Sequence, residues 1–142
     1  MTGGTGLIGT ATSTVLQESG HKLTILTRRA PRETDNATYV TALADCAEPV
    51  DAVINLAGAG LADRRWSSAY KRQIVSSRVD LTRELVAWLS ECEQPPSKLI
   101  SASAIGYYGA AEAQTFTESG EPGTGFAAAL CQSWEEEAGR AA

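Results

Sequence analysis

Four glycines fall within the first nine residues of the chain, in the stretch Met1-Thr2-Gly3-Gly4-Thr5-Gly6-Leu7-Ile8-Gly9. A helical pattern follows over 10–19, and Gly20 is a typical C-terminal stop for it. A glycine turn that leads into a helix lets backbone approach a pyrophosphate, and the helix N-terminus offers free N–H groups. The spacings Gly4-x-Gly6-x-x-Gly9 and Gly3-x-x-Gly6-x-x-Gly9 both fit a dinucleotide-binding turn, whereas the Gly-Lys-Ser/Thr of a P-loop is absent. The same glycines also allow a purely structural interpretation as a tight turn.

Short apolar segments alternate with helical ones along the rest of the chain. We expect strands at 22–27, 39–43, 52–57 and 98–103, helices at 67–92 and 126–139, and loops at 28–36 and 110–125. In the long segment 67–92 the apolar residues recur at steps of three to five, which indicates a helix. Strands that alternate with helices predict an α/β fold, with a parallel sheet covered on both faces.

Composition excludes several classes of function. The net charge is -5, and Lys and Arg occur in no cluster beyond short pairs, which argues against nucleic acid or an anionic membrane as a partner. No apolar run approaches the roughly 20 residues of a membrane span, and no signal peptide is recognisable. The three cysteines are far apart and His21 is the single histidine, so we expect neither a disulfide framework nor a metal site. These features favour a cytoplasmic protein.

The residue that reads the adenosine ribose is expected about 20 residues beyond the glycine turn. Arg28 lies 19 residues past Gly9, at the end of the predicted strand 22–27, and Arg29 follows it. An acidic residue here would accept hydrogen bonds from the ribose of NAD, whereas a guanidinium suits a 2′-phosphate. The position therefore favours NADP(H) over NAD(H). The alternative is a solvated loop arginine.

Several motifs together resemble a known family. "TGGTGLIG", "LTRR", "INLAG", "RRW", "SSR" and "ISASAIGYYG" occur in order along the chain. They resemble the extended short-chain dehydrogenase/reductases, that is, the NAD-dependent epimerase/dehydratase superfamily, and more narrowly its atypical, YfcH-like epimerase-family subgroup. The resemblance implies a Rossmann-type doubly wound parallel sheet in three α/β/α layers, a small-molecule substrate and a possible homodimer.

The resemblance also implies which residues face the cofactor. The residues that would hold the pyrophosphate are Gly3, Gly4, Thr5, Gly6, Leu7, Ile8 and Gly9. Those expected along the rest of NADP(H) are Thr27, Arg28, Leu56, Ala57, Gly58, Gln73 and Arg78. Without the resemblance, Arg78 would be interpreted as a surface charge on a helix.

The catalytic pattern of the superfamily is incomplete in this chain. Active members use a Ser/Thr at the end of the fifth strand and a Tyr-x-x-x-Lys pair, in which the lysine lowers the tyrosine pKa. Ser103 matches the first position, and Tyr108 matches a tyrosine that borders the substrate. Phe126 and Leu130 stand at the Tyr and Lys positions, and no Tyr-x-x-x-Lys occurs anywhere in the sequence. We therefore take Ser103 and Tyr108 as the catalytic candidates. Tyr107 is the alternative proton donor, and a lining or packing role is the alternative for both tyrosines.

From a comparison with the superfamily pattern, we expect the chain to be a piece that lacks residues at both ends. Only Met1 and Thr2 precede the glycines, whereas a Rossmann first strand needs about 5 residues there. The sequence stops after the predicted fifth strand and its helix, so we expect residues 1–142 to be a partial Rossmann domain, without the C-terminal substrate region.

Three functional hypotheses remain open. The first is an NADP(H)-dependent oxidoreductase or epimerase that acts by hydride transfer on a small substrate such as a nucleotide sugar. The second is a non-catalytic module that binds or senses NADP(H), which the missing catalytic pair favours. The third is that the chain binds nothing because its first strand is largely absent.

Overall fold

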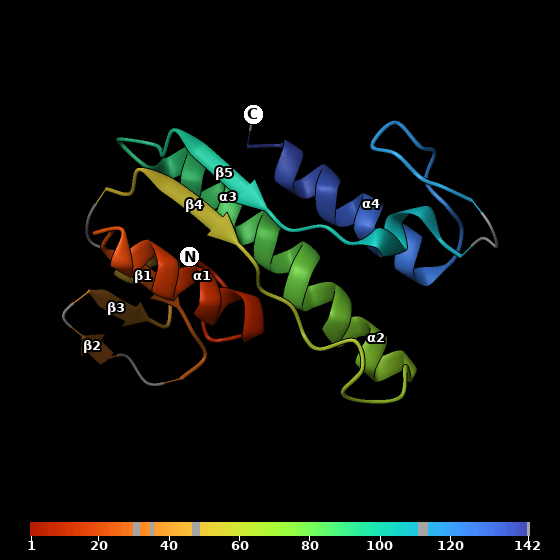
Figure 1. Cartoon of the computed structure of the whole chain (residues 1–142), viewed down its shortest axis with the longest axis horizontal. Helices are drawn as coiled ribbons and strands as arrows, with labels where there is room; N and C mark the ends of the chain where they lie inside the picture. The colour runs from red at the N-terminus through yellow and green to blue at the C-terminus, as the bar shows by residue number, and fades with distance from the viewer. Residues whose placement is uncertain (30–31, 35, 47–48, 111–113, 142) are drawn as a thin grey trace.

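A computed structural model describes residues 1–29, 32–34, 36–46, 49–110 and 114–141 (Figure 1). Its elements, in order, are α1 (Leu7–Glu18), β1 (Leu23–Leu26), β2 (Arg32–Thr34), β3 (Ala37–Val40), η1 (Leu43–Asp45), β4 (Ala52–Asn55), α2 (Ser68–Val75), η2 (Ser76–Asp80), α3 (Leu81–Glu91), β5 (Lys98–Ser101), η3 (Ile105–Tyr108) and α4 (Phe126–Gly139). The predicted α/β class is confirmed.

The sheet consists of two parts that meet at the N-terminus. β1 pairs in parallel with β3, and β4 pairs in parallel with β5. Thr2 lies between the two parts and forms single parallel bridges to Leu26 and to Asn55. The Thr2 N–H donates to the Ile54 carbonyl at 2.9 Å, and the Leu26 N–H donates to the Met1 carbonyl at 2.9 Å. The spatial order is therefore β2-β3-β1-Thr2-β4-β5, with Met1 and Thr2 in the position of the central strand.

The predicted loop 28–36 is wrong in part, because β2 forms within it. β2 runs antiparallel to β3, so the sheet is not purely parallel. The Thr34 hydroxyl donates to the Ala37 carbonyl at 3.1 Å and helps to close the hairpin. Glu33 and Thr34 are exposed, so this edge strand carries no apolar alternation from which it could be predicted. The predicted strand 39–43 is also shifted: β3 ends at Val40, and η1 follows.

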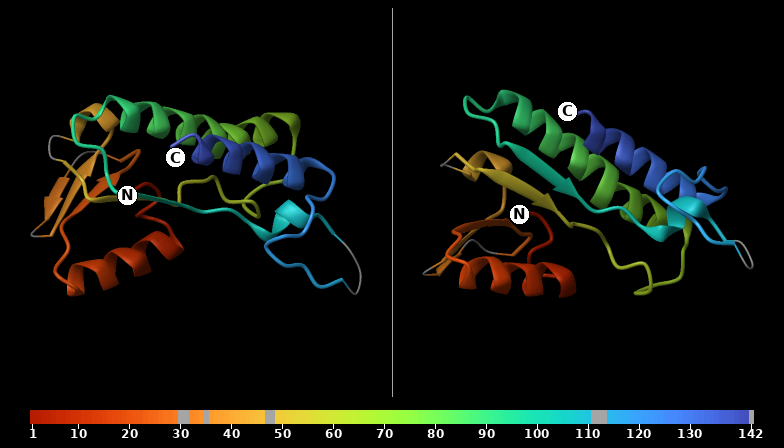
Figure 2. Two further views of the ribbon diagram at one scale, coloured as in Figure 1. Left: turned by 90° about the horizontal axis from the view of Figure 1, so that it is seen from above. Right: turned by 45° about the horizontal axis from the view of Figure 1, so that its top comes forward.

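Helices cover both faces of the sheet, as expected. In Figure 2, α1 lies on one side, and α2, α3 and α4 lie on the other. The interior has two clusters: Val53, Leu85 and Leu89 between β4 and α3, and Tyr70, Ile74, Val79, Leu130 and Trp134 between the long helical segment and α4. Among the described residues, no helix combines the length and the apolar character needed to cross a membrane.

The predicted helix 67–92 is continuous but not regular. η2 is a π-helical turn between α2 and α3. Ile74 and Val79 are both buried although they are five residues apart, and at about 100° per residue a regular α-helix would turn them well away from each other. The wider π turn brings Val79 back to the buried face. In the sequence, the five-residue step between Ile74 and Val79 is the signal that could have indicated this turn.

Candidate functional site

Most of the predicted cofactor residues, and Ser103, follow strands that end at one edge of the sheet. β1, Thr2, β4 and β5 all run in the same direction, so the residues that follow each of them emerge at the same edge. In open α/β sheets, ligands bind outside the carboxyl ends of the strands. The glycine turn follows Thr2, Arg28 follows β1, Leu56 to Gly58 follow β4, and Ser103 follows β5.

The glycine turn packs so closely that side chains are excluded from it. Gly3 has φ +68°, and a Cβ added there would lie 2.6 Å from the Leu56 carbonyl carbon and oxygen. A Cβ on Gly9 would lie 2.1 Å from the Gly3 carbonyl oxygen. Gly6 is the N-cap of α1 and provides no side-chain cap, and the first turn of α1 contains no acidic residue. The first N–H groups of α1 are therefore left for an anion, which fits the pyrophosphate of a dinucleotide.

Arg28 is exposed immediately after β1, on the segment that leaves the sheet beside the glycine turn. None of the ion pairs within the described residues involves it. The Arg29 N–H donates to the Thr27 hydroxyl at 3.2 Å, which holds the backbone in a turn at this point. Because no ion pair occupies it within the described part of the chain, this exposed guanidinium could accept a phosphate, and that role stays a prediction.

Arg78 lies in the π turn and reaches the loop after β4. Its Nη2 donates to the Ala59 carbonyl at 3.0 Å, and a Cβ on Gly58 would lie 2.6 Å from its Cζ. The guanidinium lies over the Trp134 ring, 5.4 Å from its centroid. Within the described residues no ion pair neutralises this half-buried charge, and burial lowers the pKa of the guanidinium. The structure thus places Arg78 against the loop that contains Gly58, and its role toward the cofactor stays a prediction.

Ser103 has a partner that the sequence reasoning missed. Its hydroxyl donates to Oε1 of Glu135 on α4. Both residues are exposed. The stretch Trp134 to Glu137 reads in sequence as a packing tryptophan on a solvated acidic helix, and no spacing rule links residues 32 positions apart. The only feature of the sequence that drew attention to this part of the helix was the "WE" pair, Trp134 and Glu135.

The positions of the missing catalytic pair are apolar in the structure as well. Leu130 is buried in the cluster with Trp134. The Phe126 ring packs edge-on against Trp66, with ring centroids 5.4 Å apart. Neither side chain can exchange a proton, so acid–base chemistry at this site would rely on other residues.

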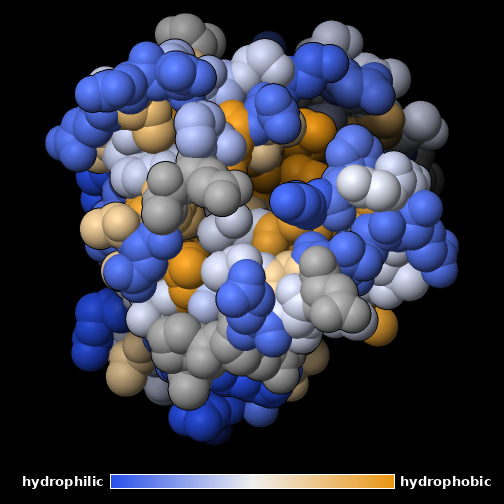
Figure 3. All heavy atoms as spheres, turned by 90° about the vertical axis from the view of Figure 1, so that its left-hand side faces the viewer, coloured by the Kyte–Doolittle hydropathy of each residue, from blue (hydrophilic) through white to orange (hydrophobic). Residues whose placement is uncertain are grey.

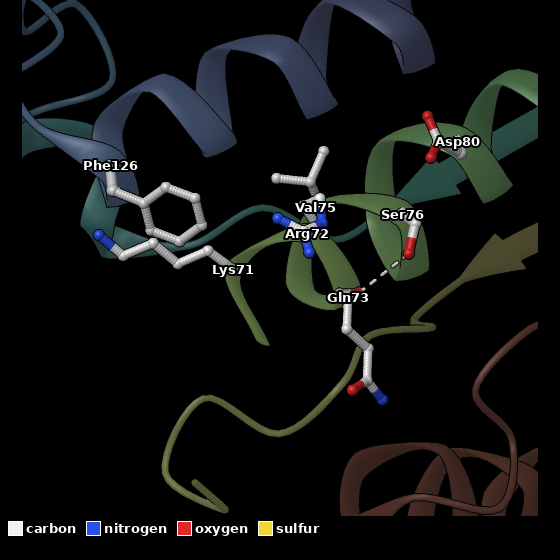
Figure 4. Close-up of a pocket in the computed structure, with 7 residues that line it drawn as sticks. All are labelled: Lys71, Arg72, Gln73, Val75, Ser76, Asp80 and Phe126. Atoms are coloured by element: carbon white, nitrogen blue, oxygen red, sulfur yellow. Dashed lines mark hydrogen bonds between the residues drawn. The ribbon is translucent and has the colours of Figure 1, made fainter. Parts of the chain in front are cut away.

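Tyr108 and Gln73 are held by other contacts. The Tyr108 ring stacks on Phe116, with centroids 4.8 Å apart, and packs edge-on against Tyr107. Gln73 lines a hollow of about 440 Å³ that runs along α2 and η2 to the start of α4. The other lining residues are Lys71, Arg72, Val75, Ser76, Asp80 and Phe126. In Figure 4 the Gln73 side chain points away from Phe126 and Lys71. The roles of both residues stay predictions.

A second hollow, of about 410 Å³, lies between η1 and the end of α3. Ala44, Cys46, Pro49, Val50, Trp88, Glu91, Cys92, Glu93 and Gln94 line it. The corresponding end of the molecule shows apolar atoms in gaps between polar side chains (Figure 3). This hollow contains none of the predicted cofactor residues. Among the described residues, no group of three or more His, Cys, Asp or Glu is arranged to hold a metal ion.

Comparison with known proteins agrees with this geometry. The model of the "NAD dependent epimerase/dehydratase family" matches residues 1–138. The chain belongs to this family. The epimerase family protein YfhF of Bacillus subtilis is 40% identical over 146 residues, which cover 96% of this chain and 48% of YfhF. The resemblance inferred from the motifs is confirmed.

Solved structures of the family show the same fold. Human epimerase family protein SDR39U1, crystallised with NADPH, superposes with a TM-score of 0.83 at 28% identity, over 96% of this chain and 47% of that one. A nucleoside-diphosphate sugar epimerase from Corynebacterium glutamicum gives a TM-score of 0.79 at 31% identity, over 99% of this chain and 30% of that one. The chain therefore spans about half the length of the curated relatives it matches.

Proposed function

We propose that this chain binds NADP(H) and forms the cofactor-binding part of an oxidoreductase or epimerase that acts on a small substrate of the nucleotide-sugar class. The observation that carries the proposal is the glycine turn at the carboxyl edge of the sheet, flanked by two arginines that make no ion pair within the described residues. The turn and the start of α1 would hold the pyrophosphate, Arg28 the 2′-phosphate, and Leu56 to Gly58 with Arg78 the next part of the cofactor. The NADPH in the SDR39U1 structure supports the choice of cofactor.

The chemistry that the bound nicotinamide supplies is the acceptance or donation of a hydride. The chain must then handle the accompanying proton, and Ser103 with Glu135 offers a route for it. A serine that donates to a carboxylate has free lone pairs with which to accept a substrate hydroxyl. When the Ser103 oxygen takes a proton from the substrate hydroxyl, the serine can pass its own hydroxyl proton to Glu135. We propose that this pair replaces the missing Tyr-x-x-x-Lys.

A second candidate function is an NADP(H)-binding module without turnover. It is favoured by the burial of Leu130 and the aromatic packing of Phe126, which leave apolar groups at both positions of the superfamily's catalytic pair. Binding of NADPH without any hydride transfer to or from a carbonyl or alcohol probe would support it.

The test of the proposed function is a calorimetric titration of the chain and of its Arg28→Ala variant with NADPH and with NADH. We expect the variant to lose about 10- to 100-fold in NADPH affinity, because charge-assisted hydrogen bonds contribute about 1.5–3 kcal/mol. Its NADH affinity should change little, since NADH has no 2′-phosphate. Arg29→Ala is the matched control and should keep most of the NADPH affinity. Equal affinity of the unmodified chain for NADPH and NADH would refute the assignment of Arg28.

A further inference from the structure

A chain of buried hydrogen bonds runs from α4 to the loop beside the glycine turn. The Trp134 indole N–H donates to the Thr82 hydroxyl at 3.0 Å, and the Asn55 amide also donates to that hydroxyl, at 2.8 Å. The Thr2 hydroxyl donates to Asn55 Oδ1 at 2.6 Å. The Ala57 N–H donates to the Thr2 hydroxyl at 3.2 Å. Four elements that are distant in sequence are thereby connected.

The direction of each hydrogen bond in this chain is fixed. An indole N–H and an amide NH₂ can only donate, so the Thr82 oxygen accepts from both. The other end of the Asn55 side chain is an acceptor, which makes the Thr2 hydroxyl its donor and leaves the Thr2 lone pairs for the Ala57 N–H. Asn55 also donates to the Ser101 hydroxyl at 3.2 Å, which ties β5 to the same amide. Each bond thus orients the next.

These groups are too deeply buried for water to replace a lost partner. Thr2, Asn55, Thr82 and Trp134 are 2%, 1%, 0% and 5% exposed. A buried donor that is left without an acceptor costs more than the bond itself contributed. Removal of the Thr82 hydroxyl would leave the Trp134 indole N–H and one of the two Asn55 amide hydrogens without an acceptor, while Asn55 would still donate to Ser101. The cost would favour a shift of Asn55 from its present position.

Trp134 reaches the cofactor edge by two routes. The first is the hydrogen-bond chain, which ends at Ala57. Leu56 and Ala57 are the backbone that a Cβ added to Gly3 would meet, at 2.6 to 2.8 Å. The second is its ring, which supports the Arg78 guanidinium. We propose that Thr82 and Trp134 are positioning residues of the dinucleotide site. From the helices on one face of the sheet, they hold the end of β4 where the glycine turn packs against it. This inference rests on the proposed function, since it assigns the turn to the cofactor.

The experiment compares Thr82→Val, which keeps the shape of the side chain and removes its hydroxyl, with Thr82→Ser, which restores the hydroxyl. The first readout is hydrogen exchange of the Ala57 amide in the nucleotide-free chain. We expect exchange about tenfold faster in Thr82→Val and close to the original rate in Thr82→Ser. The second readout is calorimetric affinity, and we expect NADPH and NADH to weaken by the same factor of about ten, because the network acts on the turn and not on the 2′-phosphate.

Two further variants separate positioning from stability. Leu89→Ala opens a cavity in the cluster of Val53, Leu85 and Leu89, and should lower the melting temperature without changing the affinity for either dinucleotide.

Trp134→Phe removes the indole N–H that donates to Thr82, so it breaks the same hydrogen bond from the other side. Combined with Thr82→Val it should give less than the sum of the two single effects, because both act through one network. If Thr82→Val does not fold, Trp134→Phe carries the same test.

The outcomes distinguish this inference from the function on which it rests. Unchanged Ala57 exchange and unchanged affinities in folded Thr82→Val would overturn the positioning role. A loss of affinity in Leu89→Ala as large as in Thr82→Val would also overturn it, because the effect would then follow stability alone. If the unmodified chain binds neither dinucleotide while Thr82→Val still exposes the Ala57 amide, the proposed function fails and the hydrogen-bond network stands.

Discussion

Substitution of Gly9 by alanine is expected to remove NADPH binding, with a loss of affinity of at least about 100-fold. The added Cβ would lie 2.1 Å from the Gly3 carbonyl oxygen and 2.7 Å from the Gly4 Cα. Both neighbours are backbone, so no side chain can rotate to make room, and the turn itself must move away from α1. The first N–H groups of α1 and the glycine turn would then no longer converge on one anion. Calorimetric titration with NADPH measures the effect.

The control for this substitution is Gly139→Ala, the same change of residue type in α4. Gly139 is the last residue of α4, and nothing lies within 4 Å of a Cβ added there. Because alanine has a higher helix propensity than glycine, this variant should melt at the same temperature or slightly higher and bind NADPH normally. NADPH binding by Gly9→Ala at the unmodified affinity would show that the turn does not hold the pyrophosphate.

Ser103→Ala and Glu135→Gln are both expected to lower hydride transfer about 100-fold or more, while NADPH affinity stays within about twofold. The reason is that general acid–base groups contribute roughly 10²–10⁴-fold to rate, and these two side chains form the polar pair at the end of β5. Formation of NADPH from NADP⁺, followed in a single turnover with UDP-glucose and with UDP-glucuronic acid as probes, measures the rate of the first hydride step, because an epimerase would return the hydride to the sugar. Glu135→Asp should recover part of it.

Glu136→Gln is the matched control for Glu135→Gln. Glu136 is the adjacent carboxylate on α4 and pairs with Arg140 at 3.2 Å, away from Ser103. It should keep the full rate. A loss of rate in Tyr108→Phe as large as in Ser103→Ala would instead assign the proton transfer to Tyr108. A chain that binds NADPH and turns over neither probe would favour the module without catalysis.

The glycine turn illustrates what can be predicted from sequence alone. Its function depends on residues that are neighbours in the chain, and the distance from Gly9 to Arg28 is set by one helix and one strand of ordinary length. The predicted helix 126–139 agrees with α4 for a similar reason, since a local apolar pattern defines it. The absence of a Tyr-x-x-x-Lys pair is likewise a property of the sequence.

The tertiary structure decided how distant segments meet. It placed β2 antiparallel at the edge, and the π turn in η2 set Arg78 against Gly58. It also brought Glu135 to Ser103 and joined Thr2 to Trp134 through Asn55 and Thr82. Spacing rules describe periods within one helix or strand, whereas these contacts depend on how whole elements pack against one another. The sequence by itself therefore determined the α/β class, the glycine turn and the arginine that follows β1, and only the packing of α3 and α4 on the sheet decided which side chains support them.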